Sequence, residues 1–119
     1  MRVNALHVVY LLKIFEEKML TRSERSAIII TSSTASKLQT SGSATYNSTK
    51  ALVSSFGEAI YYEANEKIDV LAWNPAWIKT KIFTDSKNPD AEKIGEKLNL
   101  MVNTDDAVRG ALCNLGRSP

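Results

Sequence analysis

Two short apolar runs, separated by one long helical pattern, constrain the fold of this chain most. The first run covers residues 27–31, is rich in β-branched isoleucine and does not alternate with polar residues, which is typical of a strand covered on both faces. The second run covers residues 68–73 and ends at a proline that lacks the donor needed in a central strand. Between them, apolar residues at steps of three and four predict a helix over residues 44–65. The order strand, helix, strand predicts a right-handed parallel crossover, with the first strand inside the sheet. The apolar positions of the helix are Val53, Phe56, Ile60 and Ala64.

Three further helices are expected outside this unit. A stripe of apolar residues predicts a first helix over residues 1–20. Asn88 and Pro89 are suited to cap and begin a short helix over residues 90–98. A last helix should begin after Thr104, with two aspartates in its first turn. No linker or repeat divides the chain, so we expect one domain over residues 1–119. The stripe of the first helix consists of Ala5, Val8, Leu12, Phe15 and Met19.

Composition excludes several classes of function. The formal net charge is only +2, with basic and acidic residues intermixed, so we expect no binding to nucleic acid. The one cysteine, Cys113, cannot form an intramolecular disulfide, a redox pair or a metal cluster, and we read it as a small buried residue of the last helix. No run approaches the roughly 18 apolar residues of a membrane span. These features favour an intracellular protein without a membrane segment in this chain and without a metal site.

Tyr46 and Lys50 form the most informative pair for chemistry. They are four residues apart at the start of the predicted helix, and residues at this spacing lie on one helix face. A free phenol ionises only near pH ~10, and a nearby ammonium favours the ionised form. Tyr46 could therefore act as a general acid or base. Taken alone, this spacing is more often an amphipathic tyrosine beside a solvated lysine, so both interpretations stay open at this point.

Other polar residues are expected at the same edge of the sheet. Ser33 stands thirteen residues before Tyr46, directly after the first strand. Residues 74–80 leave the second strand at its carboxyl end. Since parallel strands place their carboxyl ends at one edge, where open α/β sheets bind ligands, these segments should converge there.

With these motifs in this order, the chain resembles the short-chain dehydrogenase/reductase family over nearly all of its length. The family carries a Tyr-x-x-x-Lys motif, a serine about thirteen residues upstream, an asparagine in the preceding helix and a Pro-Gly-x-x-x-Thr segment after the following strand. The resemblance implies that Tyr46 is the proton donor or acceptor and that Lys50 assists it and holds the nicotinamide ribose. It also implies that Ser33 binds the substrate oxygen and that Asn4 positions a water in the proton relay.

The resemblance further implies NADP or NAD as the cofactor. Besides Tyr46 and Lys50, the segment after the second strand would contact it through Pro75, Ala76, Ile78 and Thr80. Ala76 departs from the glycine usual in the family. A Gly-rich turn for the pyrophosphate, GxxxGxG, occurs nowhere in the sequence. We therefore expect an α/β fold with part of a Rossmann-like, doubly wound parallel sheet, the second half of such a domain, truncated at both ends and without the nucleotide-binding first half.

One branch of the family looks most similar. The runs at residues 2–6, 30–33, 46–53 and 70–75 look like hydroxysteroid dehydrogenases and very-long-chain 3-oxoacyl-CoA reductases. This implies a lipid-like small-molecule substrate, a ketone or secondary alcohol, and a cytoplasmic or endoplasmic-reticulum-associated location. The family's dimers also imply a possible homodimer through residues 1–20 and 44–65. The alternative is a non-catalytic remnant that acts as an interaction or dimerisation module.

Overall fold

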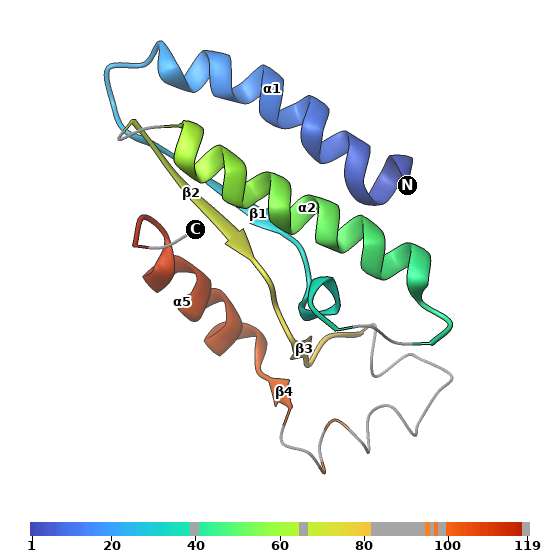
Figure 1. Ribbon diagram of the computed structural model, residues 1–119. Coiled ribbons are helices and arrows are strands. Elements are labelled where there is room, and N and C mark those ends of the chain that lie inside the picture. The colour runs from blue at the N-terminus through green and yellow to red at the C-terminus, as the bar shows by residue number, and fades with distance from the viewer. Residues whose placement is uncertain (39–40, 65–66, 82–94, 96, 98–99, 118–119) are drawn as a thin grey trace.

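The computed structural model describes residues 1–38, 41–64, 67–81, 95, 97 and 100–117, and these form a small α/β unit with parallel strands (Figure 1). The elements, in chain order, are η1 (Arg2–Leu6), α1 (His7–Leu20), β1 (Ser26–Thr31), η2 (Thr34–Ser36), α2 (Ala44–Glu63), β2 (Ile68–Trp73), β3 (Trp77–Ile78), β4 (Met101–Val102) and α5 (Thr104–Asn114).

The predicted crossover is present. Strands β1 and β2 pair in parallel, in a register that joins Ser26 to Ile68 and Thr31 to Trp73. Helix α2 connects them and packs on both strands. The predicted strands and the long helix match the observed bounds to within two residues. The chain therefore has the strand–helix–strand arrangement of a Rossmann-like fold.

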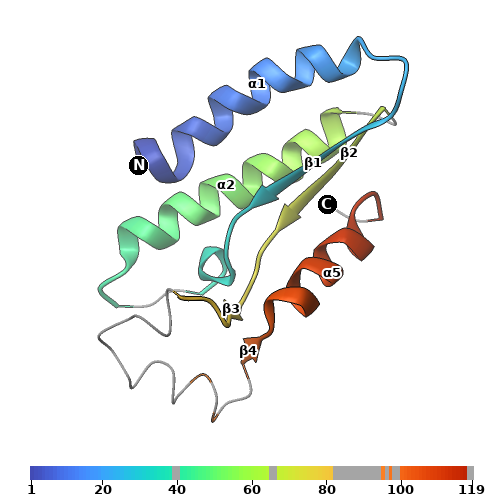
Figure 2. The same ribbon diagram turned by 180° about the vertical axis from the view of Figure 1, so that it is seen from behind.

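Helices lie on both faces of this sheet, which is the arrangement of a doubly wound fold. Helices α1 and α2 cover one face and α5 lies against the other, as the two opposite views show (Figures 1 and 2). The apolar core fills the layer between the sheet and the first two helices. Its buried members are Ala5, Leu12, Ile30, Val53, Ile60, Ala64, Ile68 and Val70.

Gly57 brings helix α2 close to the sheet. This buried glycine faces the strands in the middle of the helix, and a Cβ placed on it would lie 3.0 Å from the Cβ of Ala72 and 3.1 Å from Cδ1 of Ile30. Both distances are shorter than ordinary van der Waals contact between carbon atoms. The missing side chain therefore sets how near the helix, and the residues on its first turns, come to the strand ends.

The expectation that the first strand lies inside the sheet is wrong for the residues that the structure describes. β1 pairs with β2 along one edge, and the sheet that the two strands form has no other member among the described residues. Ala27 and Ile29 are exposed on β1. An uninterrupted isoleucine run indicates a strand, but it does not specify which neighbours cover it.

Two other elements differ from expectation, and a third lies mostly outside the described residues. The first helix begins as a π-helical turn, η1, before it continues as α1. A second, parallel two-stranded ladder pairs Trp77 with Met101 and Ile78 with Val102, and no periodicity predicted it. Apart from Gly95 and Lys97, the helix expected over residues 90–98 lies outside the described residues.

Among the described helices, none combines the length and the apolar composition that crossing a membrane requires.

Candidate active site

Ser33 lies just beyond the end of β1, where it caps the short helix η2. Its backbone is extended and its side-chain Oγ accepts a hydrogen bond from the Ala35 amide at 3.2 Å. A hydroxyl that accepts in this way keeps its own O–H as a donor. The half-buried Ser33 side chain is therefore suited to donate to a ligand oxygen at the strand end.

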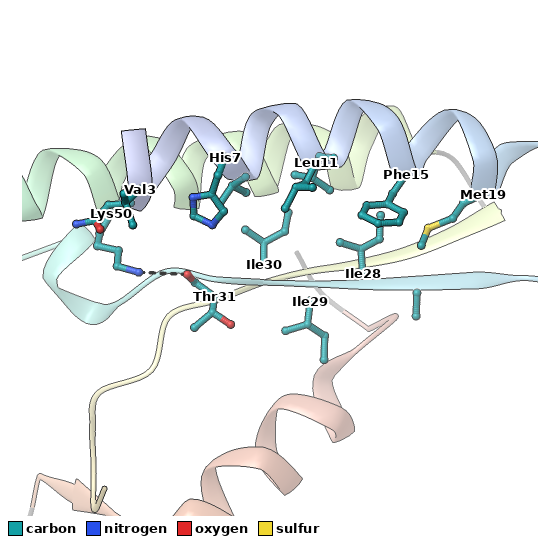
Figure 3. Close-up of a pocket in the computed structure, with 14 residues that line it drawn as sticks. Val3, His7, Leu11, Phe15, Met19, Ile28, Ile29, Ile30, Thr31 and Lys50 are labelled. Atoms are coloured by element: carbon teal, nitrogen blue, oxygen red, sulfur yellow. Dashed lines mark hydrogen bonds between the residues drawn. The ribbon is translucent and has the colours of Figure 1, made fainter. Parts of the chain in front are cut away.

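Tyr46 and Lys50 occupy the first two turns of α2 on one face of the helix. The Lys50 Nζ lies 5.9 Å from the centroid of the Tyr46 ring, within the range of a cation–π contact. The same Nζ donates to the Thr31 carbonyl oxygen at 3.3 Å, at the end of β1 (Figure 3). Tyr46 is 43% exposed, so its phenol is open to a ligand. The proximity predicted from the spacing of the two residues is present.

Three hydrogen bonds join the segment after β1 to the last residue of β2 and to the segment that follows it. The Ser32 amide donates to the Trp73 carbonyl at 2.7 Å, and the Thr34 amide donates to the Pro75 carbonyl at 3.0 Å. The Ser36 hydroxyl donates to Oδ1 of Asn74 at 3.0 Å. The two strand-end segments therefore converge, as expected for parallel strands.

The same segment after β1 is also bound to helix α2. The Ser32 hydroxyl donates to the Lys50 carbonyl at 2.6 Å, and Nδ2 of Asn47 donates to the Leu38 carbonyl at 2.9 Å. Farther along, the Lys37 ammonium lies 3.5 Å from the Glu58 carboxylate. The strand end that carries Ser33 and the helix that carries Tyr46 and Lys50 are thus held against each other.

Asn4 lies near the end of β1, at one end of the groove between α1 and β1. It lies in η1, is exposed, and lines a groove of about 600 Å³ together with Lys50. The groove runs between α1 and β1, and Figure 3 shows Leu11 and Phe15 pointing across it toward Ile28 and Ile30. The polar end of this groove, at Asn4 and Lys50, adjoins the end of β1.

The residues expected to contact a cofactor follow β2 in a short stretch. Pro75 and Thr80 are half-buried and Ala76 is exposed. Ile78 belongs to β3 and is paired with β4. Of these residues, Pro75 lies at the converged strand ends, because its carbonyl accepts a hydrogen bond from the Thr34 amide at 3.0 Å.

No matching cradle for the pyrophosphate exists among the described residues. Gly42 and Gly116 are the glycines with positive φ. A Cβ on Gly116 would lie 2.8 Å from a carboxylate oxygen of Asp69, and a carboxylate repels a phosphate. A Cβ on Gly42 would meet nothing within 4 Å, so the backbone there forms no enclosed turn. The positive-φ glycines of the described residues therefore offer no binding site for a pyrophosphate.

The structure corrects the prediction for one residue, Cys113, and adds two serines to the residues that form the site. Cys113 is exposed rather than buried, because α5 turns it away from the sheet. Sequence reasoning did not single out Ser32 and Ser36, whose hydroxyls bind Lys50 and Asn74. Only their position in the serine-rich stretch after the first strand could have pointed to them. Among the described residues, no three His, Cys, Asp or Glu side chains are grouped to hold a metal ion.

A comparison with protein-family models matches residues 1–91 to the short chain dehydrogenase family, and this match covers more than half of the chain. No curated protein and no solved structure matches the chain significantly.

Proposed function

Because this chain belongs to the short-chain dehydrogenase family, whose members are oxidoreductases, we propose that it transfers a hydride and a proton between NADP or NAD and a lipid-like substrate. The substrate is a ketone or a secondary alcohol, such as a 3-oxoacyl thioester or a steroid. The observation that supports this proposal most is the Lys50 ammonium 5.9 Å from the Tyr46 ring, bound at the same time to the strand end that carries Ser33.

Each polar side chain of the site has a separate role in the proposed reaction. The nicotinamide cofactor, when bound, supplies or accepts the hydride. In a reduction, the Tyr46 phenol donates its proton to the carbonyl oxygen, and the Lys50 cation stabilises the phenolate that remains. The Ser33 hydroxyl donates a hydrogen bond to the same oxygen and so favours the build-up of negative charge on it. Asn4, at the polar end of the groove, orders a water that returns a proton toward Lys50.

The proposed substrate class rests on sequence runs rather than on a fitted pocket. The runs 2–6, 30–33, 46–53 and 70–75 resemble hydroxysteroid dehydrogenases and very-long-chain 3-oxoacyl-CoA reductases. Apolar side chains close to the strand ends are compatible with an apolar substrate, since Leu38 is 60% exposed and Trp77 is half-buried. A ketosteroid and a long-chain 3-oxoacyl thioester should therefore both be tested as substrates.

Ketone-dependent oxidation of NADPH or NADH tests the proposal. The cofactor is added in large excess because the chain offers no pyrophosphate cradle among the described residues. Loss of general acid catalysis in Tyr46→Phe should lower kcat by roughly 100-fold or more. The control is Tyr62→Phe, which removes the hydroxyl of a tyrosine on the same helix that is 76% exposed and has no lysine four residues later. Equal rates for the wild type and Tyr46→Phe would exclude Tyr46 from the reaction.

A second candidate function, association through helices α1 and α2, has its own observation in favour. Tyr10 and Ile14 on α1 are 67% and 52% exposed, and Leu52 on α2 is 42% exposed. Tyr10 and Ile14 are four residues apart and so lie on one face of α1, and exposed apolar side chains on one face often mark a protein interface. We infer a homodimer through residues 1–20 and 44–65, which would serve a non-catalytic protein as well as an enzyme. In sedimentation experiments, Ile14→Glu should shift a wild-type dimer to monomer, while Lys13→Glu on the neighbouring exposed position should not. A wild-type monomer at high concentration would contradict this interface.

A further inference from the structure

Ser32 stands out among the residues to which neither the motifs nor the proposed reaction assigns a role. Its side chain is only 3% exposed and its hydroxyl donates to the backbone carbonyl of Lys50 at 2.6 Å. A carbonyl within a helix has two lone pairs, so it can accept from a side chain in addition to the helical N–H. The Ser32 amide also donates to the Trp73 carbonyl, which fixes this residue to β2.

Lys50 is bound to the end of β1 at two points, through both its backbone and its side chain. Its carbonyl accepts from the Ser32 hydroxyl at 2.6 Å, and its Nζ donates to the carbonyl of the preceding residue, Thr31, at 3.3 Å. The two bonds run in opposite directions between the same helix position and the same strand end. They therefore restrain both the distance and the rotation of α2 relative to β1.

We propose that Ser32 is a positioning residue that sets the spacing between Ser33 on one side and Tyr46 and Lys50 on the other. Ser33 follows Ser32 directly, and Tyr46 lies one helical turn before Lys50, so one short bond fixes all three groups relative to one another. This inference rests on the proposed function. It goes beyond that function by assigning a residue that touches neither substrate nor cofactor.

The strength of the hydrogen bond between Ser32 and Lys50 determines how strongly its loss should affect the reaction rate. An O–H···O distance of 2.6 Å is at the short end of the normal range, and the Ser32 hydroxyl belongs to a buried residue. Without the Ser32 hydroxyl, the strand end would be joined to Lys50 only by the longer hydrogen bond from the flexible Lys50 side chain to the Thr31 carbonyl. A misplacement of about 1 Å in a reacting group can cost about 100-fold in rate. Binding of an apolar substrate does not depend on this spacing to the same degree, so the loss should appear in kcat.

The test compares Ser32→Ala with a matched control in the intact chain. Ser54→Ala also removes a buried hydroxyl, that of a residue 1% exposed, and this hydroxyl binds Glu58 on the same helix rather than the strand end. In the ketone-dependent assay, Ser32→Ala should lower kcat roughly 10- to 100-fold and change KM by less than about threefold. Ser54→Ala should stay close to the wild-type kcat. Ser32→Thr, which keeps a hydroxyl, should recover most of the lost rate.

Three results would overturn the proposal. They are a kcat for Ser32→Ala within twofold of the wild type, an equal loss in Ser54→Ala, and a folded Ser32→Thr as slow as the alanine variant. If circular dichroism shows that Ser32→Ala does not fold, Ser32→Cys takes its place. A thiol is a weaker donor of similar size, so kcat should fall by a smaller factor, and a wild-type kcat in this variant would also overturn the proposal.

Amide hydrogen exchange gives a readout that does not need turnover. Ser32→Ala should speed exchange at the Thr34 and Ser36 amides, which donate to Pro75 and Ser33, while Ser54→Ala should not. Unchanged exchange in Ser32→Ala contradicts the positioning role. If wild type and Tyr46→Phe are equally inactive but exchange responds as expected, the proposed reaction fails and the positioning of the strand end by Ser32 stands.

Discussion

Replacing Gly57 by alanine measures how closely helix α2 must approach the sheet. The new Cβ would stand 3.0 Å from the Cβ of Ala72 and 3.1 Å from Cδ1 of Ile30. The Ile30 methyl is the end of a flexible side chain and is able to move aside. The Ala72 Cβ is attached directly to the backbone of β2, so relief there requires the helix or the strand to shift.

Two opposing effects set the size of the change. Alanine favours a helix interior by about 1 kcal/mol relative to glycine. Overpacking of a buried contact costs typically about 1–3 kcal/mol. Because the closest contact is a backbone-anchored methyl, we expect the packing cost to exceed the gain, and Gly57→Ala to be destabilised by about 1 kcal/mol.

Gly110→Ala is the matched control, since it makes the same replacement inside a helix without the contact. Gly110 lies in α5, and a Cβ there would meet nothing within 4 Å. This variant should gain up to about 1 kcal/mol from helix propensity alone. Thermal unfolding followed by circular dichroism should then separate the two variants by about 8 °C, at roughly 4 °C per kcal/mol. A Gly57→Ala variant as stable as Gly110→Ala would refute the argument that the glycine permits the close approach.

Three other predictions concern the surface and the cofactor. Cys113 is exposed, so a thiol reagent should modify it in the folded protein at close to the rate for the unfolded chain; protection until unfolding would contradict its placement. Arg25→Gln removes an ion pair with Asp69 in which the arginine side chain is 60% exposed, so it should cost less than about 1 kcal/mol and less still in high salt; a larger, salt-independent loss would show that the pair is more than a surface contact. In calorimetric titrations, the 119-residue chain should bind NADPH more weakly than the micromolar range, because its described residues provide no pyrophosphate cradle; micromolar binding would contradict this.

The elements with a strong local pattern were predictable from the sequence. Helix α2 and strand β2 follow from apolar spacing and from the Asn74-Pro75 break, and their observed bounds agree closely with the predictions. The pairing of β3 with β4 was not predictable, because two-residue strands carry no periodicity and their partners are more than twenty residues apart. The exposure of Ala27 and Ile29 on β1 likewise depends on which segments lie beside the strand, and the composition of the strand does not contain that information.

The candidate site likewise has one part that the local sequence predicted and one part that it did not. The proximity of Tyr46 and Lys50 follows from their spacing on one helix, since residues four apart are neighbours on its surface. The choice among the serines after β1 does not follow from local sequence. Ser32, Ser33 and Ser36 have the same side chain, and their different partners are set by the direction in which each points once the strand ends have converged.

Stability and site geometry therefore depend on one shared distance in this fold, that between α2 and the strands. Gly57 permits a short distance between α2 and β2, because the absence of a side chain lets the helix approach Ala72. Ser32 restrains the distance between α2 and β1, because its 2.6 Å hydrogen bond to the Lys50 carbonyl tolerates little displacement of the helix. Local sequence places Tyr46 and Lys50 on one face of α2, and these two non-local contacts hold that helix against the strands. A substitution that moves α2 should therefore disturb the candidate site even when it lies two helical turns away from it.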